Sequence, residues 1–367
     1  MRIMNTPKHL DLELTTNCNL SCRYCSHFTS PGDVSGNLPT EEWLKFFEEL
    51  SRCAVLDVTL TGGEPFCRTD IKEIIQGVVD NRMRFSMLSN GALITDELAE
   101  FIAKTGRCDS IQVSIDGSRA EVHDSFRGLG SFDKAVAGIK VLRKHGVPVT
   151  VRMTIHRKNV DDIENTARFL LEELGLPSFS TNAASFLGIC REYADEVQLR
   201  PEDRTKAMDT QLRLARKYPG RITATAGPLS EARRWLNMEK AVKEGWEHPE
   251  GYGKLVGCGC PTQKMAVRAD GIIIPCSHLS QMEMGQINQV DLTEVWQNHP
   301  HLQTLRDRRE IPLSSFEHCQ GCDYIPFCTG NCPGIAYNTM GTVNHPCPQA
   351  CLRNFLNNGG RLPNVPE

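Results

Sequence analysis

The chain has 367 residues, enough for two domains, and its 40% apolar and 23% charged residues are ordinary for a globular protein. A net charge of −4 gives no basic excess of the kind that nucleic acid selects. No apolar stretch approaches the roughly 20 residues that cross a bilayer, and the N-terminus lacks a secretory signal. We therefore expect a cytoplasmic protein without nucleic-acid or membrane partners.

The first half of the chain alternates between strand-like and helix-like stretches. The predicted strands are His9–Leu14, Leu56–Thr61, Phe85–Leu88, Ser110–Ile115, Val147–Thr154 and Phe179–Ala183. The predicted helices between them are Thr40–Leu50, Asp70–Asn81, Thr95–Thr105, Ser131–His145 and Asp161–Leu174. This alternation predicts a parallel α/β sheet, a fold that places its chemistry at the C-terminal ends of the strands.

The pattern changes after about Leu199. Two helices are predicted, at Pro201–Tyr218 and Ser230–Glu244, and the chain then becomes rich in Gly, Pro and Cys. Val267–Pro275 is predicted to form a short hairpin. The arginine-rich stretch from Arg306 to Glu310 is predicted to be a solvated face, with docking of an acidic partner as the alternative. A region so poor in long apolar segments cannot build a large core, and such regions are usually held by disulfides or metals.

Sixteen cysteines in a cytoplasmic chain need an explanation. Disulfides are rare in a reducing compartment, and packing as small hydrophobic side chains explains scattered cysteines but not clustered ones. Twelve of the sixteen fall into two groups along the chain. This clustering favours metal or iron–sulfur ligation.

The first group is Cys18, Cys22 and Cys25, in a loop after the first predicted strand. Three thiolates do not complete a structural zinc site, which has four protein ligands. They suit a [4Fe–4S] cluster with one iron left open for a cofactor or substrate. The alternative is a zinc loop with a distant fourth ligand such as His27.

This Cys-x3-Cys-x2-Cys loop, with Tyr24 before its third cysteine, resembles the radical S-adenosylmethionine (SAM) superfamily. A GGEP sequence follows the second strand, and short polar turns follow the third and fourth, in the order that the family has them. Each turn alone is ordinary for an α/β protein, but together they support the resemblance. The residues that it assigns to SAM binding are Tyr24, Gly62, Gly63, Glu64, Ser89, Asn90, Ser114, Asp116 and Arg127.

The resemblance implies a fold, a cofactor and a reaction. The fold is a partial (β/α)6 TIM-like barrel, expected over residues 1–200 and followed by a helical linker over residues 201–250. One electron from the reduced cluster cleaves SAM, and the resulting 5′-deoxyadenosyl radical abstracts a hydrogen atom from the substrate. A flavodoxin- or ferredoxin-type protein is the expected electron donor.

The second group of cysteines, over residues 251–367, is similar to the SPASM domain found in many radical SAM enzymes. It contains a regular run, Cys319-x2-Cys322-x5-Cys328-x3-Cys332. The resemblance implies two auxiliary [4Fe–4S] clusters, and so three in all. The first takes Cys260, Cys276 and Cys332, with Cys258 as the expected fourth ligand; the alternative is an open site that Cys258 does not fill. The second takes Cys319, Cys322 and Cys328, closed by Cys347 or Cys351. The alternative is two zinc ribbons.

Two of the remaining cysteines are candidates for catalysis. A radical epimerase needs a thiol that donates hydrogen, and Cys67 and Cys190 each follow a predicted strand end. Simple packing is the alternative for both, and it is the expected role of Cys53 and Cys108.

The family resemblance implies a substrate class as well. Most enzymes with this layout modify peptides or proteins, so we expect a ribosomally made peptide that is crosslinked, epimerised or oxidised. Only seventeen residues precede Cys18, so a separate leader-binding protein, or the core itself, is expected to recognise the peptide. The alternatives are tetrapyrrole or quinone-cofactor biosynthesis, sulfatase maturation, and a non-catalytic electron carrier.

Overall fold

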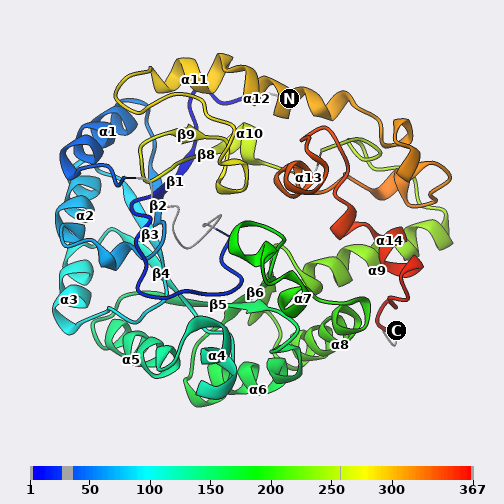
Figure 1. Cartoon of the computed structure of the whole chain (residues 1–367), viewed down its shortest axis with the longest axis horizontal. Helices are drawn as coiled ribbons and strands as arrows, with labels where there is room; N and C mark the ends of the chain where they lie inside the picture. Colours follow the sequence, from blue (N-terminus) through cyan, green and yellow to red (C-terminus); the bar gives the residue numbers. More distant parts are fainter. Residues whose placement is uncertain (1–2, 27–35, 257, 365–367) are drawn as a thin grey trace. The chain divides into compact units, whose positions relative to one another are not determined.

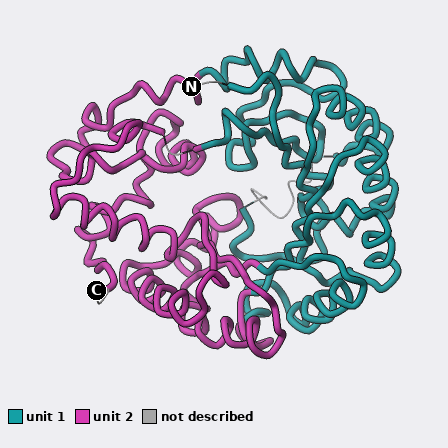
Figure 2. Tube along the Cα trace, turned by 180° about the vertical axis from the view of Figure 1, so that it is seen from behind, with its two compact units in different colours: residues 1–115, 123–151, 259–303 teal, residues 116–122, 152–258, 304–367 magenta. Residues whose placement is uncertain are grey.

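The computed structural model describes residues 3–26, 36–256 and 258–364 and divides into two compact units. Unit 1 comprises residues 1–115, 123–151 and 259–303, and unit 2 comprises residues 116–122, 152–258 and 304–367 (Figure 2). Each unit therefore combines segments from both halves of the chain. The domain boundaries expected from the sequence stay a prediction.

Unit 1 is built on a sheet with the strand order β9-β8-β1-β2-β3-β4, in which only β8 and β9 pair antiparallel. Its strands are β1 (His9–Glu13), β2 (Asp57–Thr61), β3 (Arg84–Ser89), β4 (Cys108–Ser114), β8 (Lys264–Val267) and β9 (Ile273–Ile274). β1 to β4 confirm the predicted parallel α/β class. β8 comes from the cysteine-rich region and extends the sheet beside β1, a pairing that the sequence did not predict.

Helices α1, α2 and α3 lie along one side of strands β1 to β4 (Figure 1). α1 buries Trp43, Phe46, Phe47 and Leu50, whose spacing places them on one face of the helix. The helices that belong wholly or partly to this unit are α1 (Thr40–Arg52), α2 (Ile71–Asp80), α3 (Asp96–Thr105), α4 (Ala120–Arg127), α5 (Ser131–Lys144), α10 (Cys260–Gln263), α11 (Leu292–Asn298) and α12 (Pro300–Asp307).

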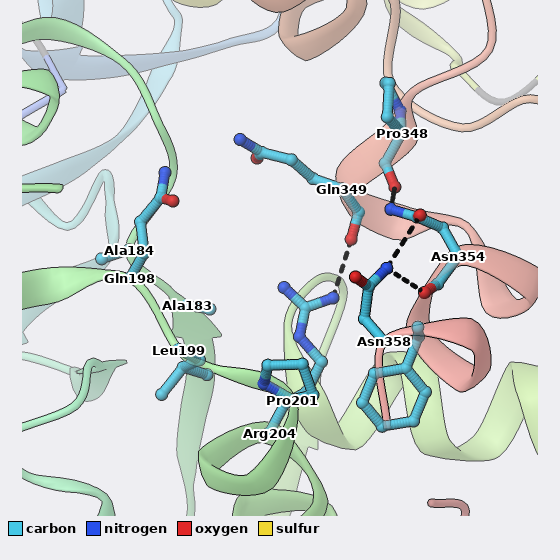
Figure 3. A pocket seen from close by; sticks show the side chains of 11 residues that line it. Ala183, Ala184, Gln198, Leu199, Pro201, Arg204, Pro348, Gln349, Asn354 and Asn358 are labelled. Carbon is cyan, nitrogen blue, oxygen red and sulfur yellow. Dashed lines mark hydrogen bonds between the residues drawn. The ribbon is translucent and has the colours of Figure 1, made fainter. Parts of the chain in front are cut away.

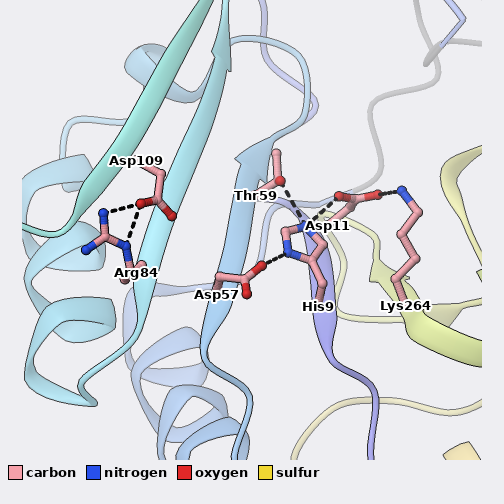
Figure 4. Close-up of polar contacts among 7 residues, drawn as sticks. All are labelled: His9, Asp11, Asp57, Thr59, Arg84, Asp109 and Lys264. Carbon is pink, nitrogen blue, oxygen red and sulfur yellow. Dashed lines mark hydrogen bonds and ion pairs between the residues drawn. The ribbon is translucent and has the colours of Figure 1, made fainter. Parts of the chain in front are cut away.

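A polar network joins the N-terminal parts of β1, β2 and β8 (Figure 4). His9 hydrogen-bonds to Asp57 through Nδ1, and through Nε2 to Asp11 at 3.1 Å and to Thr59 at 3.0 Å. Lys264 donates to Asp11 at 3.0 Å. Burial lowers the pKa of His9, but its hydrogen bonds to the two carboxylates outweigh burial and raise it. His9, Asp57 and Lys264 are the first residues of their strands, and Asp11 and Thr59 are the middle residues of theirs, so the network stabilises the register of β1, β2 and β8.

Unit 2 contains the strand order β5-β6-β7, and its helices α8 and α9 pack against each other. A buried cluster of Met208, Ala232, Trp235, Met238, Leu352 and Phe355 anchors the C-terminal segment to these two helices. The elements are β5 (Val149–Ile155), β6 (Phe179–Ala183), β7 (Ile222–Ala224), α6 (Ile163–Arg168), α7 (Ala194–Val197), α8 (Pro201–Lys217), α9 (Pro228–Glu244), α13 (Pro333–Met340) and α14 (Leu352–Asn357).

The helix predicted at Asp161–Leu174 is not a single α-helix. A 3-10 turn at Val160–Asp162 leads into α6, which continues as a π-helix over Phe169–Glu173. Within the described residues, no helix of the protein is both long and apolar enough to cross a membrane.

Candidate functional site: the cysteine loop and the strand ends of unit 1

The loop after β1 carries the first three cysteines, all partly exposed. The backbone N–H of Cys25 donates to the carbonyl of Cys22 at 3.0 Å, so the two residues lie in one tight turn. Burial raises the pKa of the Cys18 thiol to about 11, and the nearby charges of Glu64, Cys25 and Cys67 add to this shift. These thiols are therefore gathered at one place beside a carboxylate. His27, the alternative zinc ligand, lies outside the described residues.

The two glycines of the GGEP sequence bring the end of β2 against this loop. A Cβ on Gly62 would lie 2.4 Å from the carbonyl oxygen of Thr15, and one on Gly63 would lie 2.3 Å from that of Asn17. The backbone N–H groups of Gly63 and Glu64 donate to these same two oxygens, at 2.7 and 2.8 Å. Gly62 also has φ +132°, which side chains disfavour. Glycine is thus required for contact with the segment that leads into Cys18.

Glu64 is fully buried and links the end of β2 to the end of β3. Its carboxylate accepts hydrogen bonds from Ser89 Oγ at 2.9 Å and from the backbone N–H groups of Asn90 at 2.7 Å and Phe66 at 3.3 Å. Burial raises the pKa of Glu64 to about 7, although these hydrogen bonds and the charge of Arg127 act to lower it. A carboxyl group whose pKa lies near 7, at the end of a strand, is a candidate to bind a cationic group.

Asn19 is a site residue that the sequence analysis did not single out. Its side-chain oxygen accepts from Asn90 Nδ2 at 2.8 Å, and the Cys67 thiol lies 4.0 Å from the same oxygen. Asn90 Nδ2 also lies 3.9 Å from Cys18 Sγ. The position of Asn19 between Cys18 and Cys22 is the signal that could have drawn attention to it. These contacts place Cys67 at the edge of the cysteine loop.

Tyr24 and Arg127 form a second contact beside the cysteines. The Arg127 guanidinium lies over the Tyr24 ring, 5.3 Å from its centroid, and is 7% exposed. The N–H of Arg23 donates to the carbonyl of Phe126 at 3.1 Å, which ties the loop to the end of α4. Unit 1 therefore brings together seven of the residues predicted to bind SAM: Tyr24, Gly62, Gly63, Glu64, Ser89, Asn90 and Arg127.

The other predicted residues have different surroundings. Ser114 ends β4 in unit 1, whereas Asp116 and Cys190 belong to unit 2 and are fully buried. The Asp116 carboxylate accepts from the N–H of Thr154 at 2.7 Å, and its carbonyl accepts from Asn159 Nδ2 at 2.9 Å. Asp116 thus supports the end of β5. Roles for Ser114, Asp116 and Cys190 in binding or catalysis stay predictions.

A small apolar pocket in unit 2 holds the candidate ligands of the second auxiliary cluster. The cysteines that line it are Cys319, Cys322, Cys328, Cys347 and Cys351. Within the described residues, no group of three or more His, Cys, Asp or Glu is arranged to hold a single metal ion. Five thiols around one apolar pocket form a soft donor set, which fits an iron–sulfur cluster.

The candidate ligands of the first auxiliary cluster are divided between the units. Cys260 and Cys276 belong to unit 1, where the charges of both act to raise the pKa of Lys264. The Cys260 thiol donates to the Pro275 carbonyl at 2.7 Å. Cys258 and Cys332 belong to unit 2, where their charges act on Arg308.

The prediction that residues 306–310 form a solvated face is wrong for two of the arginines in this stretch. Arg306 is 6% exposed and Arg308 is 2% exposed. The sequence pattern suggested solvent exposure because arginine is rarely buried without a partner. Burial here comes from the folding of the surrounding segments, which a local charge pattern does not report.

A separate pocket in unit 2 lies at the C-terminal end of β6 and encloses about 340 Å³ (Figure 3). The amide side chains of Gln198, Gln349, Asn354 and Asn358 line it. Arg204 is the only charged side chain among the described lining residues. Its guanidinium is paired, since Nη1 donates to the Gln349 carbonyl at 2.7 Å and lies 3.4 Å from a carboxylate oxygen of Glu231. The pocket is therefore polar and close to neutral.

Comparison with known proteins identifies the class. The profile of the Radical SAM superfamily matches residues 12–170, and that of the SPASM iron–sulfur cluster-binding domain matches residues 258–323. The chain is also 31% identical to the AdoMet-dependent heme synthase of Methanosarcina barkeri, over 92% of this chain and 94% of that protein. The protein therefore belongs to the radical SAM superfamily, as an enzyme with a SPASM domain. This confirms the predicted family and enzyme class.

Other relatives carry different names. The chain is 28% identical to the PqqA peptide cyclase of Granulibacter bethesdensis, over 96% of this chain and 89% of that protein. It is 34% identical to the subtilosin biosynthesis protein AlbA of Bacillus subtilis, over 89% of this chain and 67% of that protein. The curated relatives thus include proteins named for tetrapyrroles and proteins named for peptides.

Solved structures share the fold. Streptococcus suis SuiB bound to its precursor peptide SuiA has a TM-score of 0.73 at 18% identity, covering 95% of this chain and 77% of that one. The enzyme anSMEcpe with bound AdoMet has a TM-score of 0.68 at 18% identity, covering 96% of each chain. These likenesses confirm the predicted fold class, an α/β radical SAM core with a SPASM domain.

Proposed function

We propose that Cys18, Cys22 and Cys25 hold a [4Fe–4S] cluster with an open iron, and that the protein modifies a ribosomally made peptide. When bound, the cluster and SAM supply the 5′-deoxyadenosyl radical that takes a hydrogen atom from the substrate. The support is the set of three thiols and the residues gathered around them in unit 1. The chain's own part is to bind and orient these groups and to exclude water.

Around SAM, the proposed roles follow from charge and position. Glu64 accepts a hydrogen bond from the methionyl ammonium, because it is the carboxylate beside the cysteine loop. Arg127 pairs with the methionyl carboxylate, since its guanidinium lies beside Tyr24 in the same loop. The glycines keep the backbone close to the loop. Cys67 is the proposed hydrogen donor if the modification is an epimerisation, because its thiol contacts Asn19 next to Cys18.

For the second auxiliary cluster we propose Cys351 rather than Cys347 as the closing ligand. The charges of Cys322, Cys328 and Cys351 all act on the pKa of Cys319, and that of Cys322 acts on Cys351. The charges that act on Cys347 are instead those of Glu231 and Arg204. Both cysteines line the same pocket, but the charges that act on Cys351 include that of Cys322, whereas those that act on Cys347 come from outside the run of cysteines. The first auxiliary cluster keeps its proposed ligands Cys258, Cys260, Cys276 and Cys332.

The pocket at the end of β6 carries the proposal of a peptide substrate. Parallel α/β folds bind ligands at the C-terminal ends of their strands, and 340 Å³ falls within the usual range for ligand pockets. The amide side chains of Gln198 and Gln349 complement the N–H and C=O groups of a peptide backbone, whereas those of Asn354 and Asn358 already donate within the pocket wall. A tetrapyrrole carries several carboxylates and needs unpaired cations, whereas Arg204 is already paired with Glu231. A neutral amide lining therefore favours a peptide.

Tetrapyrrole modification is the second candidate, and one observation favours it. The similarity to AdoMet-dependent heme synthase extends over nearly the full length of both proteins. The electron donor and a separate leader-binding protein stay predictions under either function.

The substrate class is tested by co-expressing the protein with a small peptide encoded beside its gene and measuring the peptide's mass. We expect the loss of two hydrogen atoms for a crosslink or desaturation, or the gain of one deuterium in heavy water for an epimerisation. An unchanged peptide, with a carboxylate lost from an added iron–porphyrin instead, contradicts the peptide proposal and supports the second candidate. The control is the triple variant Cys18→Ala, Cys22→Ala, Cys25→Ala.

Filling the pocket is expected to separate peptide binding from SAM cleavage. In Ala184→Phe an aromatic ring occupies the pocket, so we expect the KM for the peptide to rise about tenfold or more, as loss of one or two good contacts does. Deoxyadenosine formation without peptide is expected to persist. The matched control is Ala226→Phe, at an exposed loop position outside the pocket. An unchanged KM in Ala184→Phe excludes this pocket as the peptide site.

A further inference from the structure

Arg308 is a buried cation whose hydrogen bonds are incomplete. It begins the 3-10 turn Arg308–Glu310 and is 2% exposed. Its Nε donates to the carbonyl of Val343 at 3.1 Å, and its Nη2 lies 3.5 Å from that of His345. Nη1 has no hydrogen-bond partner among the described residues. A buried guanidinium with an unpaired N–H is costly, so the folded enzyme needs a further partner at this point.

The charges around Arg308 indicate what that partner is. Burial lowers the pKa of Arg308, whereas the nearby side chains of Cys258 and Cys332 act to raise it. The neighbouring Arg309 donates to the carbonyl of Cys258 at 3.4 Å, which fixes the backbone of that cysteine in the same part of unit 2. Both cysteines are candidate ligands of the first auxiliary cluster.

We propose that Arg308 is a positioning residue for that cluster, whose Nη1 donates a hydrogen bond to a cluster sulfide or to a ligating sulfur of Cys258 or Cys332. This inference rests on the proposed function in one respect, namely that these two cysteines ligate a cluster. A cluster bound by thiolates carries negative charge, so it supplies the countercharge that the buried guanidinium lacks.

The arrangement has a consequence for electron transfer. Hydrogen bonds and positive charge near the sulfurs of a cluster stabilise its reduced form, because reduction adds negative charge. Arg308 therefore makes the first auxiliary cluster easier to reduce. This property suits a cluster that takes up an electron from a substrate radical.

The test compares Arg308→Met with the wild-type holoenzyme and with Arg213→Met, a matched surface variant in unit 2 whose side chain is 57% exposed. The readouts are iron content and an EPR-monitored redox titration. We expect one cluster of Arg308→Met to become harder to reduce by at least tenfold in its equilibrium constant, which is 59 mV for one electron. The other clusters, and every cluster of Arg213→Met, are expected to titrate as in the wild type.

A second variant keeps the test decisive if Arg308→Met does not fold. Arg308→Gln retains an amide donor for the Val343 carbonyl but lacks the charge, and the same shift is expected. Unchanged titration of every cluster in a fully loaded Arg308 variant overturns the inference and leaves Arg308 as a brace for the Val343–His345 turn. Wild-type protein whose iron accounts only for the SAM-binding cluster refutes the proposed auxiliary cluster instead.

Discussion

Replacing Cys18, Cys22 and Cys25 together by alanine is expected to abolish 5′-deoxyadenosine formation. The variant should lose about four iron atoms per chain and keep the iron of the auxiliary clusters. The physical reason is that the three thiolates are the only proposed protein ligands of the SAM-binding iron, and no other proposed group delivers an electron to SAM. Iron analysis and chromatography of deoxyadenosine, after reduction with dithionite and SAM, measure both effects.

The matched control for this variant is Cys53→Ala. Cys53 lies at the end of α1, where its sulfur is 3.6 Å from Thr293 Oγ1, away from the cysteine loop. It should retain iron and activity. Deoxyadenosine formed at the wild-type rate by the triple variant contradicts the proposed mechanism. Loss of all iron from the triple variant shows instead that loading of the auxiliary clusters depends on the first site.

Replacing Glu64 by glutamine is expected to weaken SAM binding by about 10- to 100-fold, the usual cost of a hydrogen bond to a charged group. The amide keeps the shape of the side chain but does not attract the methionyl ammonium. The amide N–H of glutamine would also point toward a backbone N–H that now donates to the Glu64 carboxylate, either that of Asn90 or that of Phe66. Equilibrium dialysis with labelled SAM measures the affinity, and Glu48→Gln, at an exposed position on α1, is the control. Equal affinity in wild type and Glu64→Gln excludes the proposed contact.

The same substitution predicts a change in the pH dependence of stability. Burial raises the pKa of Glu64 to about 7, above its value in the unfolded chain. The stability that this group contributes is therefore fully present below the unfolded pKa and is lost as the pH rises toward 7. Across that window, the free energy of unfolding of the wild type should fall relative to Glu64→Gln by about 1.4 kcal/mol per pH unit. Denaturant titrations of the apoproteins between about pH 4.5 and 7 measure this fall, and parallel curves for the two proteins contradict it.

Local sequence patterns predicted most elements of the first half of the chain. β1 to β6 lie within two residues of their predicted ends, because buried strands and amphipathic helices carry their periodicity in neighbouring residues. The pairing of β8 with β1 was not predictable in this way, since it joins segments from opposite ends of the chain. The π-helix at Phe169–Glu173 was also missed, because its spacing differs little from that of an α-helix.

The candidate site was predictable where the sequence carries a motif. Cys18, Glu64 and Asn90 were found because each follows a strand end, and the structure brings them together. The burial of Arg308 was not predictable, since it depends on the carbonyls of Val343 and His345 and not on its own neighbours in sequence. A sequence motif identifies candidate binding and catalytic residues. The burial of a charged side chain depends on tertiary packing, which a motif does not report.

The pairing of β1 with β8 sets an order for assembly during translation. His9 lies opposite Lys264, so the strand that leads into the cysteine loop keeps one unpaired edge until most of the chain has left the ribosome. Contacts between such distant residues form slowly, and an open parallel strand edge is prone to aggregation. Before β8 is synthesised, the thiols of Cys18, Cys22 and Cys25 follow a strand that still lacks one of its partners. Complete pairing of β1 therefore requires that β8 has been synthesised.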